Sequence, residues 1–60
     1  MGEKLKAARQ AAGMTQGELA EKVGCDQRAI SEWENGRREP VASTLKKLAQ
    51  ALGCKIDDIV

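Results

Sequence analysis

The sequence contains no histidine, and its two cysteines have no obvious base beside them. Neither a glycine-rich phosphate loop nor an acidic metal-binding cluster is present, which argues against an enzyme. Two cysteines without histidine also leave too few preferred ligands for zinc. We therefore predict a protein that is not an enzyme and that has no metal or other cofactor.

Aromatic residues are almost absent as well, because the chain has no phenylalanine or tyrosine and a single tryptophan. The core must then be built from Leu, Ile, Val, Ala, Met and Cys, a composition that suits packed helices. A chain of 60 residues buries only about 60% of its unfolded surface and cannot support two cores. We predict one all-α domain over residues 1–60, with a small margin of stability.

Long hydrophobic runs are missing too, since no stretch approaches the roughly 20 apolar residues of a membrane span. The first residues also lack the apolar region of a signal peptide. We therefore expect a cytoplasmic protein with no membrane partner. Thiols stay reduced in that compartment, which favours buried free thiols at Cys25 and Cys54. The alternative is a disulfide between them, which depends on a distance that the sequence does not specify.

Charge of one sign is not in excess. Ten Lys and Arg against nine Asp and Glu give a net charge of +1. The pI of 7.8 is below the value above about 9 that marks a strongly basic nucleic-acid-binding domain. Attraction to nucleic acid must then come from local clusters such as Arg28, Arg37 and Arg38. Acidic neighbours of these arginines predict modest affinity and a shallow dependence on salt.

A pattern of two helices around a glycine is the main feature that the sequence does contain. Thr15, followed three residues later by Glu18, has the form of a capping box and predicts a helix that starts near Gln16. Gly24 supplies the positive φ at which helices commonly end. A second helix is predicted over about residues 27–35.

The helix expected over residues 27–35 has two different faces. At about 100° per residue, polar side chains fall in one arc and apolar side chains in the opposite arc. The polar arc comprises Gln27, Arg28, Ser31 and Glu32, and the packing arc comprises Ala29, Ile30 and Trp33. Asp26 is placed to cap the start of this helix.

Three further helices are expected on either side of this pair, which makes five in all. Apolar spacing predicts the first over residues 2–12. The fourth is indicated by i, i+3, i+4, i+7 spacing and ends at Gly53; its apolar positions are Leu45, Leu48, Ala49 and Leu52. Residues 55–60 suit a last short helix that closes the core.

These features resemble the lambda-type phage repressor (XRE) helix-turn-helix family. The resemblance rests on the glutamine that opens the second helix, the alanine four residues on, the glycine turn, the isoleucine of the third helix and the run ISEWENGRREP. The runs LKAARQAAGMTQ and TLKKLAQALGCKIDDI extend it over nearly the whole chain. It implies a compact five-helix domain that binds double-stranded DNA as a transcriptional regulator. Val41 departs from the pattern, because the family usually has a Ser, Thr, Asp or Asn cap after the proline.

The resemblance also implies that the third helix enters the major groove, where each base pair presents a distinct pattern of groups. Gln27 can pair with adenine and Arg28 with guanine. A phosphate contact is the alternative for Arg28. Glu32 can accept from cytosine N4 or repel wrong sites, and Ser31 is a weaker candidate. A solvated helix face is the alternative for all four.

Four residues are expected at the DNA backbone. Gln16 begins the second helix, where unpaired N–H groups and the helix dipole favour a phosphate. Arg37 and Arg38, in the loop after the third helix, are expected to contact phosphate. Arg9 is expected, by resemblance, to pair with Glu34 and also to face phosphate. An exposed pair of this kind would contribute only about 1 kcal/mol.

A single domain of this kind reads half of a site, and the family usually binds as two-fold dimers. The resemblance thus implies a weak or DNA-assisted homodimer on a palindromic operator, most simply as a repressor. Its interface would use exposed parts of the last two helices, the loop before them, or Val60. The alternative function is a protein-interaction module such as an antitoxin, which a long unstructured tail would favour. No small-molecule ligand is predicted.

Overall fold

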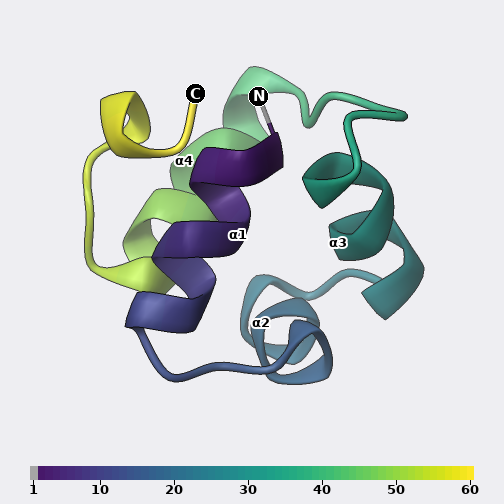
Figure 1. Ribbon diagram of the computed structural model, residues 1–60, viewed down its shortest axis with the longest axis horizontal. Coiled ribbons are helices and arrows are strands. Elements are labelled where there is room, and N and C mark those ends of the chain that lie inside the picture. The colour runs from purple at the N-terminus through teal and green to yellow at the C-terminus, as the bar shows by residue number, and fades with distance from the viewer. Residues whose placement is uncertain (1) are drawn as a thin grey trace.

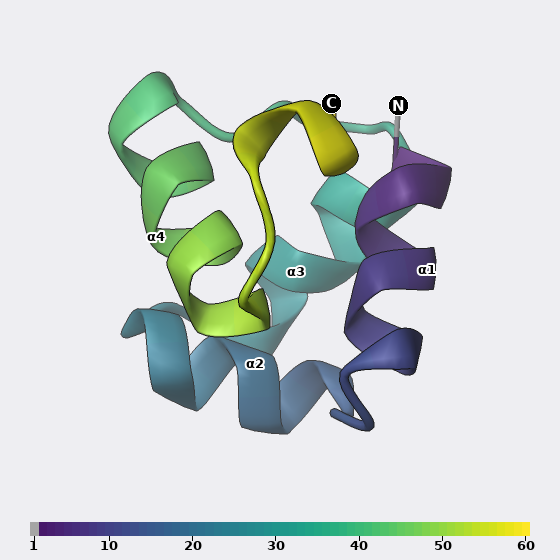
Figure 2. The same ribbon diagram turned by 90° about the vertical axis from the view of Figure 1, so that its left-hand side faces the viewer.

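The computed structural model of the chain describes residues 2–60 and has no strand within them. The elements are α1 (Gly2–Ala11), α2 (Gln16–Val23), α3 (Gln27–Glu34), α4 (Ala42–Leu52) and the 3₁₀ helix η1 (Ile56–Asp58). Helix α2 packs against α3 and α4, and α1 packs against α3 (Figure 1). Figure 2 shows η1 at the same end of the molecule as the first turn of α1. The predicted all-α fold is confirmed, and none of the described helices has the length and apolar character to span a membrane.

The fifth predicted helix is a single 3₁₀ turn. The Asp58 N–H donates to the Lys55 carbonyl, and the Asp58 carboxylate accepts from the Lys55 N–H, both at 3.0 Å. Three residues are too few for the i to i+4 bonds of an α-helix. Residues 2–60 therefore form four α-helices and one 3₁₀ turn. Both α1 and α3 end one residue before their predicted ends, because the chain then turns through left-handed glycines, Gly13 and Gly36.

The start and end signals of α2 are as predicted. The Thr15 hydroxyl accepts from the Glu18 N–H at 3.1 Å, and the Glu18 carboxylate accepts from the Thr15 N–H at 2.9 Å. Gly24 ends the helix with φ of 81°. The cap predicted from the Asp26 side chain is wrong. The backbone carbonyl of Asp26 accepts from the Ala29 N–H at 3.0 Å, and its carboxylate makes no cap bond.

Helix α4 begins without a side-chain cap. Val41 occupies the N-cap position in an extended conformation and is 67% exposed. Its carbonyl accepts from the Leu45 N–H at 2.9 Å, but a valine side chain has no acceptor for the other free N–H groups of the first turn. The departure of Val41 from the family pattern therefore leaves this helix start to solvent.

The core joins the four α-helices and Ile59, the residue that follows η1. Leu19, Ile30 and Leu48 have no exposed surface, and they come from α2, α3 and α4 respectively. The buried apolar residues are Leu5, Leu19, Ala20, Ile30, Trp33, Leu48, Ala49 and Ile59. Burial of each large aliphatic side chain contributes about 1.5–3 kcal/mol. The packing role predicted for Ile30 and Trp33 is confirmed.

Cys25 and Cys54 are free thiols, so the disulfide alternative is wrong. Both are half-buried and pack against the core, which is less burial than predicted. Burial raises the pKa of each thiol, with a smaller contribution from Asp26 at Cys25 and from Asp58 at Cys54. Both thiols are thus held in the protonated, weakly nucleophilic form at neutral pH.

Candidate nucleic-acid interface

The polar arc of α3 lies at the surface. Gln27 and Arg28, in the first turn, are exposed, whereas Ser31 and Glu32, one turn further, are half-buried. The opposite arc contains Ile30 and Trp33 and is buried against the other helices. The four predicted base-reading residues thus share one outward face, while α3 is held to the core by the other.

Gln27 reaches from α3 to the start of α2. A Cβ atom built on Gly17 would lie 3.3 Å from the Gln27 side-chain oxygen. Glycine leaves this amide room to lie over the first turn of α2. Sequence reasoning missed Gly17. The signal was there, because glycine inside a helix costs about 1 kcal/mol relative to alanine and often marks a close approach.

A buried polar junction connects α1, α2 and α3. The Arg9 guanidinium donates to both Glu34 carboxylate oxygens, from Nε at 2.6 Å and from Nη2 at 3.2 Å. Its Nη1 donates to the Met14 carbonyl at 2.7 Å. Only 11% of the Arg9 side chain and 2% of the Glu34 side chain are exposed. The predicted pair is confirmed, and it is buried.

Gln16 belongs to the same junction, because its side-chain amide donates to Glu34 Oε1 at 3.0 Å. Gln16 is half-buried, so part of its surface at the start of α2 still meets solvent. The guanidinium of Arg9 is directed inward by its three acceptors, and nothing in this arrangement supports the predicted phosphate contact of Arg9. Its geometry is that of a residue that holds α1 to α3.

A glycine at the start of α1 brings the same two helices together. Gly2 is buried, and a Cβ atom built on it would clash with the main-chain carbonyl groups of Trp33 and Glu34. Only glycine permits this approach of α1 to the end of α3. The residue was not singled out from the sequence, where it precedes any periodic pattern.

The loop after α3 turns back over the helix. The Arg37 N–H donates to the Glu32 carbonyl at 2.9 Å, and the Gly36 N–H donates to the Trp33 carbonyl at 3.2 Å. With Gly36 at φ of 73°, these bonds form a Schellman motif. Arg37 and Arg38 are exposed, and the N–H groups of both donate to the Glu32 carbonyl, so they lie beside the end of the polar arc of α3.

Two residues of the polar arc, Glu32 and Ser31, make contacts with other side chains. Arg38 Nη1 lies 3.3 Å from Glu32 Oε1, which forms an ion pair at the surface. The Asn35 side-chain amide donates to the Ser31 hydroxyl at 3.4 Å. No partner of this kind was expected for Glu32 or Ser31 from the sequence.

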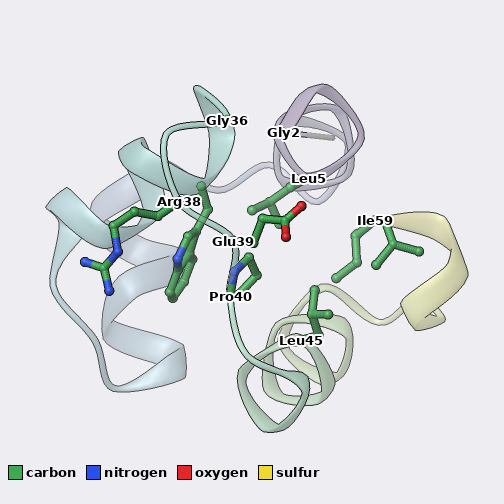
Figure 3. A pocket seen from close by; sticks show the side chains of 10 residues that line it. Gly2, Leu5, Gly36, Arg38, Glu39, Pro40, Leu45 and Ile59 are labelled. Carbon is green, nitrogen blue, oxygen red and sulfur yellow. The ribbon is translucent and has the colours of Figure 1, made fainter.

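A hollow of about 330 Å³ lies between the start of α1, the loop that joins α3 to α4 and the chain end, and Arg38 is one of its lining residues. Figure 3 shows Leu5, Leu45 and Ile59 gathered around it. Val60 also lines it and is 38% exposed. The sequence had predicted no pocket, because the hollow forms only where segments from both ends of the chain meet.

Known proteins are similar to this chain in both sequence and fold. The regulator ImmR of Bacillus subtilis is 40% identical over 57 residues, which cover 95% of this chain and 45% of ImmR. The repressor protein C2 of Salmonella phage P22 is 39% identical over 57 residues, 95% of this chain and 26% of C2. The chain thus spans less than half the length of either relative. A crystal structure of the P22 C2 repressor in complex with a synthetic operator superposes with a TM-score of 0.91 at 36% identity, covering 98% of this chain and 89% of that one.

The model of the helix-turn-helix family matches residues 5–59. The matched span includes every α-helix except the first turn of α1, and it contains the α2–α3 pair with its glycine turn. The chain belongs to the helix-turn-helix family, and within it to the phage-repressor (XRE) type.

Proposed function

We propose that this protein binds double-stranded DNA sequence-specifically and acts as a transcriptional regulator, most simply a repressor. The observation that carries the proposal is the polar arc of α3, which faces outward while α3 packs against α2. The fold that holds it superposes on the P22 C2 repressor in its operator complex. An α-helix fits the major groove, with its N-terminal residues at the base edges. Gln27 and Arg28 occupy those positions and are exposed.

Base reading is assigned to four residues and backbone contact to a second set. Gln27 and Arg28 carry groups that match adenine and guanine, and Glu32 and Ser31 lie one turn further along α3. Gln16 stands at the N-terminus of α2, where backbone N–H groups favour a phosphate. Arg37, exposed after α3, is a second phosphate contact. For Arg38, a phosphate contact would compete with its ion pair to Glu32.

A weak or DNA-assisted homodimer is part of the proposal. One α3 helix supplies too few contacts for specificity, and two copies on half-sites about 34 Å apart would give a palindromic operator. The exposed apolar side chains of Val41, Ile56 and Val60 are available for such an interface. The proposed place of action is the cytoplasm, with the DNA that the protein binds.

The proposal is tested by selecting bound sequences from a random DNA pool and measuring Kd for the selected site. Arg28→Ala should lose about 1–3 kcal/mol of discrimination at one base pair. Lys47→Ala, which removes a positive charge from the exposed face of α4, is the matched control and should leave discrimination unchanged. Failure to bind any DNA at low salt would exclude the proposed function, and equal loss on all sequences would exclude base reading by Arg28.

A further inference from the structure

The surface ion pair between α3 and the following loop places a cation beside a proposed base-reading carboxylate. Arg38 Nη1 lies 3.3 Å from Glu32 Oε1, with 65% of the Arg38 side chain and 26% of the Glu32 side chain exposed. One carboxylate oxygen of Glu32 is thus engaged by Arg38. The other has no hydrogen bond to the residues described.

The backbone brings these two residues together. The Schellman motif at Gly36 returns the chain onto the last turns of α3, where the Glu32 carbonyl accepts from the Arg37 N–H at 2.9 Å and from the Arg38 N–H at 3.4 Å. Arg38 therefore begins its side chain next to Glu32. The pair follows from the way α3 ends, and it does not depend on a chance encounter of two long side chains.

The direction of Arg38 is also informative. Arg38 is among the residues that line the apolar hollow around Leu5 and Ile59, but Figure 3 shows its guanidinium pointing away from that hollow. On the outer side of α3, a second hollow of about 350 Å³ is lined by Asp26, Arg28, Ala29, Glu32 and Arg38. Arg38 and Arg28 thus flank Glu32 on the surface proposed to face DNA.

An unpaired carboxylate on that surface would weaken DNA binding, because phosphates on both sides of the groove repel it. A guanidinium that holds one of its oxygens offsets this repulsion and fixes the other oxygen in one direction. An oriented carboxylate oxygen is the acceptor suited to the cytosine N4 amino group. In water such an exposed pair is weak, but it strengthens when DNA excludes water around it.

We propose that Arg38 determines specificity by positioning Glu32 for one base, instead of serving as one more phosphate contact. Arg38 is then a positioning residue, and Glu32 is the residue that touches the base. The inference rests on the proposed DNA-binding function and refines it at one position of the half-site. Arg37, its exposed neighbour, has no ion pair among residues 2–60 and remains a phosphate contact.

The test measures Kd for the selected site and for all single base-pair changes within it. Arg38→Ala and Glu32→Gln should each lose about tenfold discrimination at the same base pair. In the Glu32→Gln background, Arg38→Ala should cause no further loss. Arg37→Ala, the matched control, should weaken binding to all sequences by a similar factor and lower the salt slope by about 1.

Two results would overturn the inference while leaving the proposed function intact. One is an equal loss on all sequences by Arg38→Ala, as for Arg37→Ala. The other is independent, multiplicative loss by Arg38→Ala and Glu32→Gln. Absence of binding by the unaltered protein would instead overturn the proposed function. Both residues are on the surface, and circular dichroism should confirm that each variant keeps the helical fold.

Discussion

Two arginine–glutamate ion pairs involve glutamates in the last turns of α3. They differ in the number of contacts, in the contact distances and in the exposure of the side chains. Arg9 and Glu34 form two hydrogen bonds, at 2.6 and 3.2 Å, with 11% and 2% of their side chains exposed. Arg38 and Glu32 form one contact at 3.3 Å, with 65% and 26% exposed. The residue types are the same, but the first pair is enclosed by three helices and the second lies on the surface.

This difference shows that burial determines how much such a pair contributes to the stability of the fold. In the interior, removal of one partner leaves a charge without water or counter-charge, which is strongly destabilising. At the surface, water replaces a lost partner at little cost. The inner pair therefore stabilises the junction of α1, α2 and α3. The outer pair contributes little to folding and is free to serve recognition.

The largest effect is expected at the inner pair. Arg9→Ala should lower the free energy of unfolding by about 3–5 kcal/mol, because the buried Glu34 carboxylate loses its counter-charge. Chemical denaturation followed by circular dichroism measures this loss. A domain of 60 residues has little stability to spare, so the variant is expected to be partly unfolded at 25 °C.

A double variant separates loss of the pair from loss of packing. Arg9→Met combined with Glu34→Leu removes both charges and keeps most of the side-chain volume, so it should recover most of the stability lost in Arg9→Ala. A double variant as unstable as Arg9→Ala would show that the buried charge is not the cause. The hydrogen bonds to Gln16 and to the Met14 carbonyl would then be the main contribution.

A smaller effect is expected at the outer pair. Arg38→Ala should change the free energy of unfolding by less than about 1 kcal/mol, since water solvates the Glu32 carboxylate that remains. The same denaturation experiment in 1 M salt should abolish even this difference, because screening acts on exposed charges. The loss from Arg9→Ala should persist in salt. Equal salt sensitivity of the two variants would contradict the contrast between the pairs.

The smallest effect involves a third glutamate, Glu18, which is fully exposed. The Thr15 backbone N–H, and secondarily the Thr15 side chain, lower the pKa of the Glu18 carboxyl below its ordinary value of 4.5. A lowered folded-state pKa means that the stabilisation is present above pH 4.5 and is lost as pH falls through the folded-state pKa.

Thermal unfolding of the protein and of Glu18→Gln between pH 7 and pH 3 measures this contribution. The stability difference between the two proteins should shrink as the Glu18 carboxylate of the unaltered protein is protonated. A difference that stays constant over this range would contradict a charged capping box at the start of α2.

Local signals predicted α2 and α3 well. The bonds between Thr15 and Glu18 and the positive φ of Gly24 are each made within a few residues, so residue type and spacing suffice to predict them. The packing arc around Ile30 followed from helical periodicity. The cap at Asp26 failed because the backbone carbonyl closed the turn, an alternative that residue type does not reveal.

The surroundings of the site residues were less predictable. The pairing of Arg9 with Glu34 followed from family resemblance, but its burial did not, because burial depends on three helices that meet there. The ion pair of Glu32 with Arg38 joins residues six apart and requires the left-handed Gly36 between them. Periodicity predicts the faces of a helix, but it does not predict that the loop after α3 folds back against Glu32.

The sequence by itself determined where α2 begins and ends, which arc of α3 packs, and membership of the phage-repressor type of helix-turn-helix family. These properties depend on hydrogen bonds and periodicities that span one or two helical turns. Only the tertiary structure decided that Arg9 faces inward, that Gln16 bonds to Glu34, and that Arg38 lies against Glu32. Each of these depends on how much water remains around a charge, and that is set by chain segments distant in sequence.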